Sequence, residues 1–379
     1  MGPVSRIART LGLGAALALA LAVPAAANDA GVEVVASGLD NPRGLDLVDG
    51  TLWVAEAGEG GAGPCVPGPE GTDVCFGTSG ALTAVDLSSG TQARVSSDLP
   101  SLANPDGTRA TGPSDVSIGP KGLWLTVGLG GPTATRDLLP EAGQGMGRLY
   151  RLGWDGQLKA VADFHAFEVA NNPDAAEPGS DVESNPNSLD AKARPVVVAD
   201  AGGNDILAVK HGAISVLSLL PFGEAPFPDL PEPPPGSPPP GTIVPVDPVP
   251  TSVVRAPDGS LYVGQLTGFP FVPGAAKVFR IPPGGGAPAV VASGFTLITD
   301  IALGPDGSLY VVEFSTQTLL GPPSPGALIR VRPDGTRVEL APGRLTTPTG
   351  VVIGKHAAYV SNFGAAPNDG EVLRIPLGD

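Results

Sequence analysis

The sequence predicts an all-β fold, a six-bladed β-propeller, from three observations. Six segments share one pattern: a turn residue and a small polar residue, an apolar strand, a turn with Gly in most copies, and a second apolar strand ending in a mostly polar residue. The first and last residues of the pattern are 14 or 15 positions apart in every copy. A strand pair repeated in this way cannot bury both faces alone and must stack against its neighbours, as the blades of a propeller do. The six copies are residues 42–56, 113–127, 186–200, 250–265, 298–313 and 348–362.

The N-terminus has the features of a cleaved secretory signal. Arg6 and Arg9 precede an apolar run at 11–23 and small residues at 25–27, and no Cys follows at the cleavage point. We expect residues 1–27 to be removed and residues 28–379 to form one domain. The apolar run is short for a bilayer, so the sequence predicts a secreted, extracellular product without membrane insertion.

Each repeat supplies the inner half of a blade, and the residues after it supply the outer half. The first strand is expected to be innermost, and a tight turn such as Asp258-Gly259 or Asp306-Gly307 leads to the second strand. A third strand follows a Gly in most copies, as at 147–152 and 326–331, and a fourth lies outermost, as at 288–292. The aromatic residues of the second strands are expected to pack between blades. Helical periodicity is absent after residue 27.

The last repeat lacks a fourth strand of its own. Its third strand at 370–375 is followed by only a few residues, whereas the segment 31–36, ahead of the first repeat, alternates like an outer strand. We predict that this N-terminal strand completes the last blade and closes the ring, which removes exposed sheet edges.

The first three repeats carry extra residues in three insertions. One contains the two cysteines of the chain, Cys65 and Cys75, which in an exported protein are expected to form a disulfide. The second is a polar stretch at 171–185. The third, at about 221–250, is Pro-rich and is predicted to be an extended or disordered loop.

Charge and motif content narrow the function classes. The chain has 38 Asp and Glu residues against 22 Lys and Arg residues, which disfavours nucleic acid and anionic membranes as partners. The three His residues are scattered, and no serine-hydrolase, Walker or zinc-protease motif is present. The expected partner is an extracellular small molecule or protein, and the protein is expected to be a monomer.

Two positions of the repeat are predicted to meet at one rim, because the first strand begins and the second strand ends on the same face of a propeller. Three strand-end carboxylates, Glu56, Asp200 and Glu313, are candidate ligands for a divalent cation, Ca²⁺ or Mg²⁺. No catalytic residue is assigned. Further polar residues on this face are candidates for ligand binding: Arg43, Asp115, Asn187, Asp200, Asn204, Gln265, Asp300 and Asn362. The alternative is that these residues cap turns and bind backbone amides at the rim.

Several motifs resemble those of the ScyD/ScyE family, secreted proteins named after a cyanobacterial gene cluster for a sunscreen pigment. The resemblance lies in residues 171–174 (Asn-Asn-Pro-Asp), 184–186 (Ser-Asn-Pro), 199–205 (Ala-Asp-Ala-Gly-Gly-Asn-Asp), 250–252 (Pro-Thr-Ser), 262–270 (Tyr-Val-Gly-Gln-Leu-Thr-Gly-Phe-Pro) and 304–310 (Gly-Pro-Asp-Gly-Ser-Leu-Tyr). It implies a propeller and export, and it assigns no activity because the family has none established.

The repeats also resemble NHL and SMP-30-like propellers in general. The resemblance implies a channel metal held by Glu, Asn and Asp in the lactonases of that class. Asn187 is at a comparable strand-start position, but the other copies have Arg43, Ser114, Thr251, Thr299 and Thr349 there. We therefore expect a non-catalytic propeller that binds a ligand or partner at the rim. The alternatives are a metal-dependent hydrolase or lyase using the rim carboxylates and a purely structural envelope protein.

Overall fold

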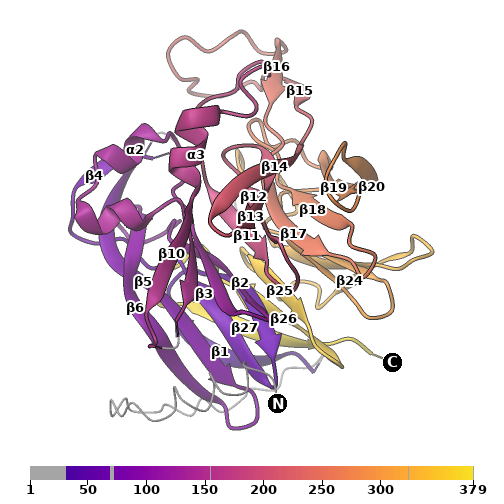
Figure 1. Ribbon diagram of the computed structural model, residues 1–379. Coiled ribbons are helices and arrows are strands. Elements are labelled where there is room, and N and C mark those ends of the chain that lie inside the picture. The colour runs from indigo at the N-terminus through magenta and orange to yellow at the C-terminus, as the bar shows by residue number, and fades with distance from the viewer. Residues whose placement is uncertain (1–30, 69–71, 154, 323, 379) are drawn as a thin grey trace.

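Six antiparallel sheets form a ring in the computed structural model, which describes residues 31–68, 72–153, 155–322 and 324–378 (Figure 1). The predicted six-bladed propeller is confirmed. The predicted signal at 1–27 lies outside the described residues.

Each blade has four main strands, which follow one another from the innermost outwards. Blade 1 has β2 (Pro42–Val48), β3 (Thr51–Glu56), β5 (Asp73–Asp86) and β6 (Thr91–Ala103), with the short β4 (Cys65–Pro67) also paired to β5. Blade 2 has β7 (Pro113–Gly119), β8 (Gly122–Val127), β9 (Arg148–Leu152) and β10 (Leu158–Asp163), and blade 3 has β11 (Pro186–Asp190), β12 (Val196–Asp200), β13 (Asp205–Lys210) and β14 (Ala213–Leu219). Blade 4 has β17 (Pro250–Arg255), β18 (Leu261–Gln265), β19 (Ala276–Ile281) and β20 (Ala289–Phe295), and blade 5 has β21 (Ile298–Leu303), β22 (Leu309–Glu313), β23 (Ala327–Val331) and β24 (Arg337–Leu340). Blade 6 has β25 (Gly350–Ile353), β26 (Ala357–Asn362), β27 (Gly370–Pro376) and β1 (Glu33–Leu39).

The ring closes through strands from the two ends of the described chain. β1 pairs antiparallel with β27, with Glu33 opposite Arg374 and Leu39 opposite Gly370. The alternating pattern of 31–36 predicted this pairing, and it is confirmed. It gives the outer edge of β27 a partner and completes blade 6.

The core lies between the blades. Trp53 of β3 packs with Ile118 and Leu125 of blade 2, and Trp124 of β8 packs with Val198 and other residues of blade 3. These second-strand aromatics are interblade packing residues, as expected. Burying an aromatic side chain in this way removes a large apolar area from water and holds two sheets face to face.

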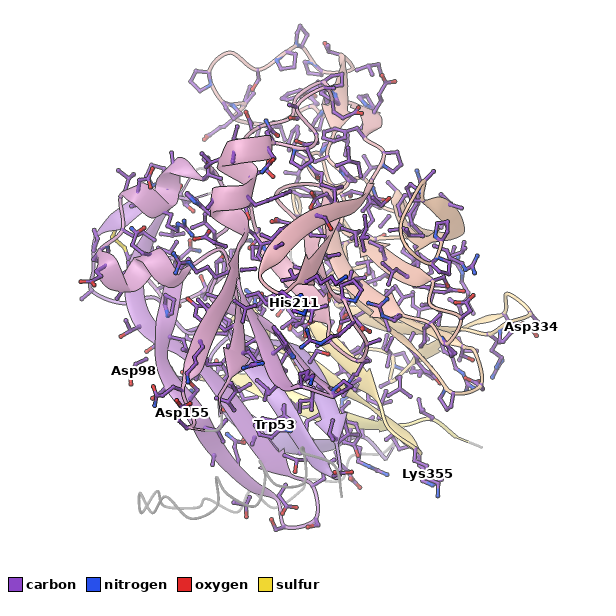
Figure 2. All side chains as sticks on the ribbon, viewed as in Figure 1. Trp53, Asp98, Asp155, His211, Asp334 and Lys355 are labelled. Atoms are coloured by element: carbon purple, nitrogen blue, oxygen red, sulfur yellow. A yellow bond between two sulfur atoms is a disulfide. The ribbon has the colours of Figure 1, made fainter. Side chains whose placement is uncertain are left out.

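All of the large insertions leave the propeller on one face, which we call the upper face. First strands begin and second strands end there, so the loops from second to third strand and from fourth strand to the next blade both lie on it. Figure 1 shows α3 (Phe164–Asn171) and the hairpin of β15 (Gly223–Pro226) and β16 (Ile243–Val246) projecting from this side. Asp155 and Lys355, which lie in turns of the opposite face, are on the side away from that hairpin (Figure 2).

Short helical segments interrupt the strands, although the sequence shows no helical periodicity after residue 27. The structure has α2 (Ala134–Asp137), the 3-10 helix η1 (Glu141–Gly145) and α3. Asp163 caps the start of α3, and its side chain accepts a hydrogen bond from the Ala166 N–H. Asn172 caps the other end in a left-handed conformation. The helix spans only eight residues, too few for a periodic apolar pattern to be visible in the sequence.

The prediction of an extended or disordered loop at 221–250 is corrected in part. Strands β15 and β16 form a hairpin, with Gly223 opposite Val246 and Pro226 opposite Ile243. The ring centroid of Phe227, next to β15, is 5.5 Å from that of Phe269, and the ring centroid of Phe269 is 6.3 Å from that of Phe271. This chain of aromatic rings connects the hairpin to the centre of the upper face.

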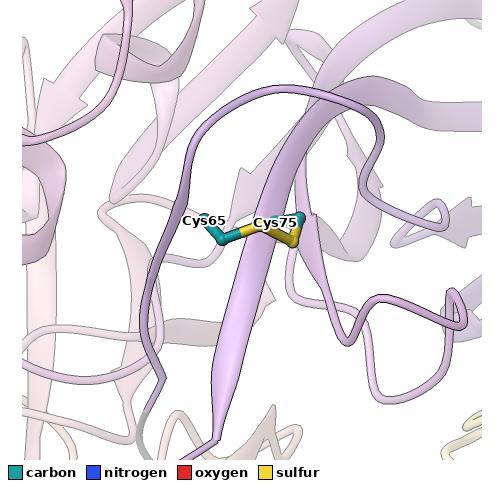
Figure 3. Close-up of a disulfide and its surroundings, with 2 residues drawn as sticks. All are labelled: Cys65 and Cys75. Atoms are coloured by element: carbon teal, nitrogen blue, oxygen red, sulfur yellow. A yellow bond between two sulfur atoms is a disulfide. The ribbon is translucent and has the colours of Figure 1, made fainter.

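The predicted disulfide is present. Cys65 of β4 and Cys75 of β5 are opposite each other in the ladder and are bonded through their sulfur atoms (Figure 3). The described residues contain no helix that is both long and apolar enough to cross a membrane.

Candidate functional site at the channel mouth

A ring of hydrogen bonds joins the six blades at the upper end of the central channel. The second residue of each repeat donates a side-chain hydrogen bond to a carbonyl of the next blade or of the segment leading into it, over 2.5–3.0 Å. The donors and acceptors are Arg43 to Ala110, Ser114 to Pro186, Asn187 to Thr251, Thr251 to Ile298, Thr299 to Pro348 and Thr349 to Pro42. The last bond returns to the first blade, so the strand-start positions form a closed circle.

These six side chains also line one cavity of about 300 Å³, which we call the mouth cavity. Its remaining wall is largely apolar and includes Phe271, Phe314 and Leu319. The sequence register therefore brought the strand-start positions to one place, as expected. The repeat pattern did not predict the apolar wall, because the residues of that wall lie in loops outside the repeated segments.

Arg43 is the more buried of the two arginines that line the mouth cavity, the other being the exposed Arg109. Burial lowers the pKa of its guanidinium to about 10. The side chain donates to the Ala110 carbonyl, and none of the ion pairs found among the described residues includes it. A guanidinium has five N–H donors, so most of the capacity of Arg43 is available to a ligand.

Below the mouth, two half-buried carboxylates, Asp115 and Asp300, face an inner cavity of about 260 Å³. Asp115 accepts hydrogen bonds from the Ser188 hydroxyl and the Leu189 N–H of blade 3. Asp300 accepts hydrogen bonds from the Ser252 hydroxyl and, at 2.7 Å, from the Val351 N–H of blade 6. Burial raises the pKa of both groups, that of Asp300 to about 6, and the charge of Asp300 raises that of Asp115 further.

The opposite end of the inner cavity carries an ion pair. The Lys192 ammonium contacts the Asp46 carboxylate, and Asp46 also accepts a hydrogen bond from the Ile118 N–H at 2.7 Å. Inner-strand carboxylates thus bind backbone amides of the neighbouring blade all along the channel. Asp115 and Asp300 belong to this set, which explains why carboxylates occur on innermost strands.

The strand-end positions mostly bind backbone N–H groups at the rim. Four of the six accept a hydrogen bond from a backbone N–H just ahead of the first strand of their own blade, over 2.5–2.8 Å. The pairs are Glu56 with Asp40 N–H, Asp200 with Asn185 N–H, Glu313 with Thr296 N–H and Asn362 with Thr346 N–H. Capping of rim amides was the alternative that the sequence left open, and these contacts have that geometry.

Glu56, Asp200 and Glu313, the candidate cation ligands, are not brought together. Glu56 pairs with Arg94 at 2.8 Å in blade 1, whereas Asp200 and Glu313 lie in blades 3 and 5. Across residues 31–68, 72–153, 155–322 and 324–378, no three or more His, Cys, Asp and Glu side chains are already grouped to hold a metal ion. The structure gives no support to one shared cation at these three residues.

The remaining candidates are dispersed. Gln265 is buried, and its Oε1 atom has no hydrogen-bond partner among the described residues. Asn204 donates to Asp174 at 3.0 Å and lies in an acidic part of blade 3. That region includes Glu168 on α3. The sequence pattern did not single out Glu168, because no helical periodicity is visible at α3.

The chain matches no protein-family model and no curated protein. Solved structures resemble it across most of its length. The PQQ-bound aldose sugar dehydrogenase from Streptomyces coelicolor has a TM-score of 0.51 and 14% identity, and covers 94% of this chain and 99% of its own. A glucose dehydrogenase has a TM-score of 0.51 and 13% identity, and the match covers 92% of this chain and 99% of the dehydrogenase. A streptogramin B lyase has a TM-score of 0.47 and 14% identity, and the match covers 91% of this chain and 97% of the lyase. At such identities the likeness shows the shared six-bladed propeller fold and leaves the chemistry to the site itself.

Proposed function

We propose that this protein is an exported propeller that binds a small organic anion in the mouth cavity, with Arg43 as the anion-binding residue. The observation that carries the proposal is a half-buried guanidinium with no carboxylate partner among the ion pairs of the described chain. Arginine binds carboxylates and phosphates through two parallel hydrogen bonds, and it does so more strongly away from water.

The cavity also indicates the rest of the ligand. Its volume of about 300 Å³ suits a small molecule, and Phe271, Phe314 and Leu319 offer an apolar wall for a ring or short hydrocarbon. Thr251 and Asn187 add hydrogen-bonding groups. Export rests on the signal pattern at 1–27 and accords with the disulfide, since such bonds persist in oxidising surroundings.

The test is calorimetric titration with a panel of aromatic and aliphatic carboxylates, each paired with its uncharged amide. We expect acids to bind at least about tenfold more tightly than their amides, because the charge on the ligand meets the guanidinium. Arg43→Gln should remove that preference, and Ser114→Ala, which alters the same hydrogen-bond ring elsewhere, should retain it. Equal discrimination in wild type and Arg43→Gln would reject the assignment.

A second candidate is acid–base catalysis by a hydrolase or lyase, and it rests on the inner cavity. Asp115 and Asp300 have raised pKa values, and a carboxyl group that titrates near pH 6 can exchange protons with a substrate under mild conditions. This role would use the channel carboxylates in place of Glu56 and Glu313. Turnover of a carboxylate that binds in the titration, lost in Asp300→Asn while binding persists, is the expected signature; equal turnover in that variant would exclude it.

A further inference from the structure

A second group of acidic side chains lies away from the channel, between α3 and the hairpin of β12 and β13. Asp200 and Asp205 are directly opposite each other across this hairpin. Glu168 on α3 and Asp174 just beyond it complete the group, and all four are at most 2% exposed. Like charges at opposite positions of a β-ladder destabilise it unless something compensates them.

The compensation differs sharply between the two aspartates. Asp200 accepts hydrogen bonds from the Ser184 hydroxyl and from the N–H groups of Asn185, Gly202 and Gly203. Asp205 is fully buried, and neither of its carboxylate oxygens has a hydrogen-bond partner in the described structure. A buried carboxylate in this condition needs a proton or a cation, because an uncompensated charge costs several kcal/mol to remove from water.

The carboxylates of Glu168, Asp200 and Asp205 border one small space beside Gly203. A Cβ atom placed on Gly203 would lie 3.3 Å from Glu168 Oε2, 3.6 Å from Asp205 Oδ1 and 3.6 Å from the carboxyl carbon of Asp200. Glycine at this position leaves the space open. Carboxylate groups from α3, β12 and β13 therefore lie around the open side of Gly203, where no side chain occupies the space between them.

We propose that this space is a Ca²⁺ site, with Asp205 and Glu168 as its charged ligands and Asp200, held by its four donors, as a nearby negative charge. Because no three acidic side chains of the described chain are yet close enough to enclose a metal, the carboxylates must move closer together around the ion, and water must complete the shell. Ca²⁺ suits such a site better than Mg²⁺, because Ca²⁺ accepts irregular coordination by about six to eight oxygen atoms whereas Mg²⁺ requires an octahedral arrangement.

An adjoining cavity offers a route for the ion. It has a volume of about 240 Å³, and its wall contains Gly202 and Asn204 of the same turn together with Asp181, Glu183 and Asp247. A cavity with this many acidic groups raises the local concentration of cations. None of the four acidic side chains of the group lines the Arg43 mouth cavity, so the proposal does not depend on the binding function proposed for that cavity.

The experiment uses the purified mature protein with and without Asp205→Asn. We expect about one Ca²⁺ per wild-type chain by elemental analysis, and a rise in melting temperature of at least about 5 °C between EDTA and millimolar Ca²⁺. Asp205→Asn should lose both, yet in EDTA it should melt no lower than wild type because it removes an uncompensated buried charge. Glu313→Gln is the matched control: it alters a buried rim carboxylate of blade 5 and should keep the full Ca²⁺ shift.

Two results would overturn the proposal. One is a wild-type protein that binds no Ca²⁺ in equilibrium dialysis and shows no shift, which would mean that the group holds a proton in place of a metal. The other is an unchanged Ca²⁺ shift in Asp205→Asn. If Asp205→Asn does not fold, Glu168→Gln provides the test from a different element, with Ca²⁺ affinity expected to fall at least tenfold.

Discussion

Single side chains at repeated positions determine how the blades are joined. The strand-start hydroxyls, amide and guanidinium each bind the following blade, and the strand-end carboxylates and amide each bind an N–H of their own. The repeat register predicted that the strand-start residues meet, because register fixes which face a strand begins on. The register could not identify the hydrogen-bond acceptors of these residues, because the position of a carbonyl in the next blade depends on how all six blades pack in the ring.

Thr349→Val tests the bond that closes this circle. The Thr349 hydroxyl donates to the Pro42 carbonyl at 2.6 Å, and valine keeps the shape but leaves that carbonyl without its donor. We expect a loss of about 1–2 kcal/mol in the free energy of unfolding, measured by urea denaturation. Thr336→Val, at an exposed turn position, is the control and should change stability by less than about 0.5 kcal/mol.

Asp300→Asn tests the half-buried carboxylate pair through pH. The folded pKa of Asp300 is about 6 against 3.8 for the ordinary group, so the folded state holds its proton more tightly than the unfolded state. Stability from this source is present at low pH and is lost as pH rises through the folded pKa. The variant has no such loss, so its stability relative to wild type should improve by roughly 2–3 kcal/mol between about pH 4 and about pH 7.

Urea denaturation of both proteins across this pH range gives the difference directly. Asparagine loses some of the hydrogen bonds of Asp300, which shifts the whole curve. It also removes the charge that raises the pKa of Asp115, which makes the loss of stability with rising pH smaller still in the variant. Parallel curves for the two proteins would show that Asp300 titrates in its ordinary range.

Elements differ in how far the chain pattern predicts them. Alternation over a few residues was enough to predict β1 as the missing strand of blade 6, because period two is visible even in a short segment. α3 was not predicted, because its eight residues form only about two helical turns. For the same reason the sequence pattern did not identify Glu168, a buried residue of α3. The Pro-rich hairpin was missed because Pro and Gly normally argue against strands.

Deleting residues 31–39 tests the closing strand. The deletion removes β1 and exposes the outer edge of β27, so we expect a mature protein that loses several kcal/mol of stability and tends to self-associate. Shortening the tip of the Pro-rich hairpin at 230–238 removes the same number of residues from a surface loop, and should leave the melting temperature nearly unchanged. Melting curves and gel filtration compare the two, and equal effects would contradict a special role for β1.

The whole molecule is a ring in which every blade contacts two others. Hydrogen bonds run from each blade to the next around the complete circle, and the hydrophobic clusters span blade boundaries. No blade therefore has a core of its own. We infer that the ring behaves as one cooperative unit, in line with the single domain expected from the repeat.

Calorimetry tests this cooperativity. We expect one unfolding transition for the mature protein, with a ratio of calorimetric to van't Hoff enthalpy of about 1. The Thr349→Val variant should shift that transition as a whole without splitting it. Two resolved transitions in wild type would show that part of the ring unfolds independently.

The pairing of β1 with β27 also sets an order of events during biosynthesis. Glu33 and Arg374 are 341 positions apart, so a ribosome adding about 5–20 residues per second needs roughly 20–70 s between them. During that interval β1 has been synthesised but its partner β27 has not. An unpaired strand can associate with other chains. The contact that finishes the ring is thus the last one the growing chain can make, and a factor that shields β1 during this interval would improve the yield of folded protein.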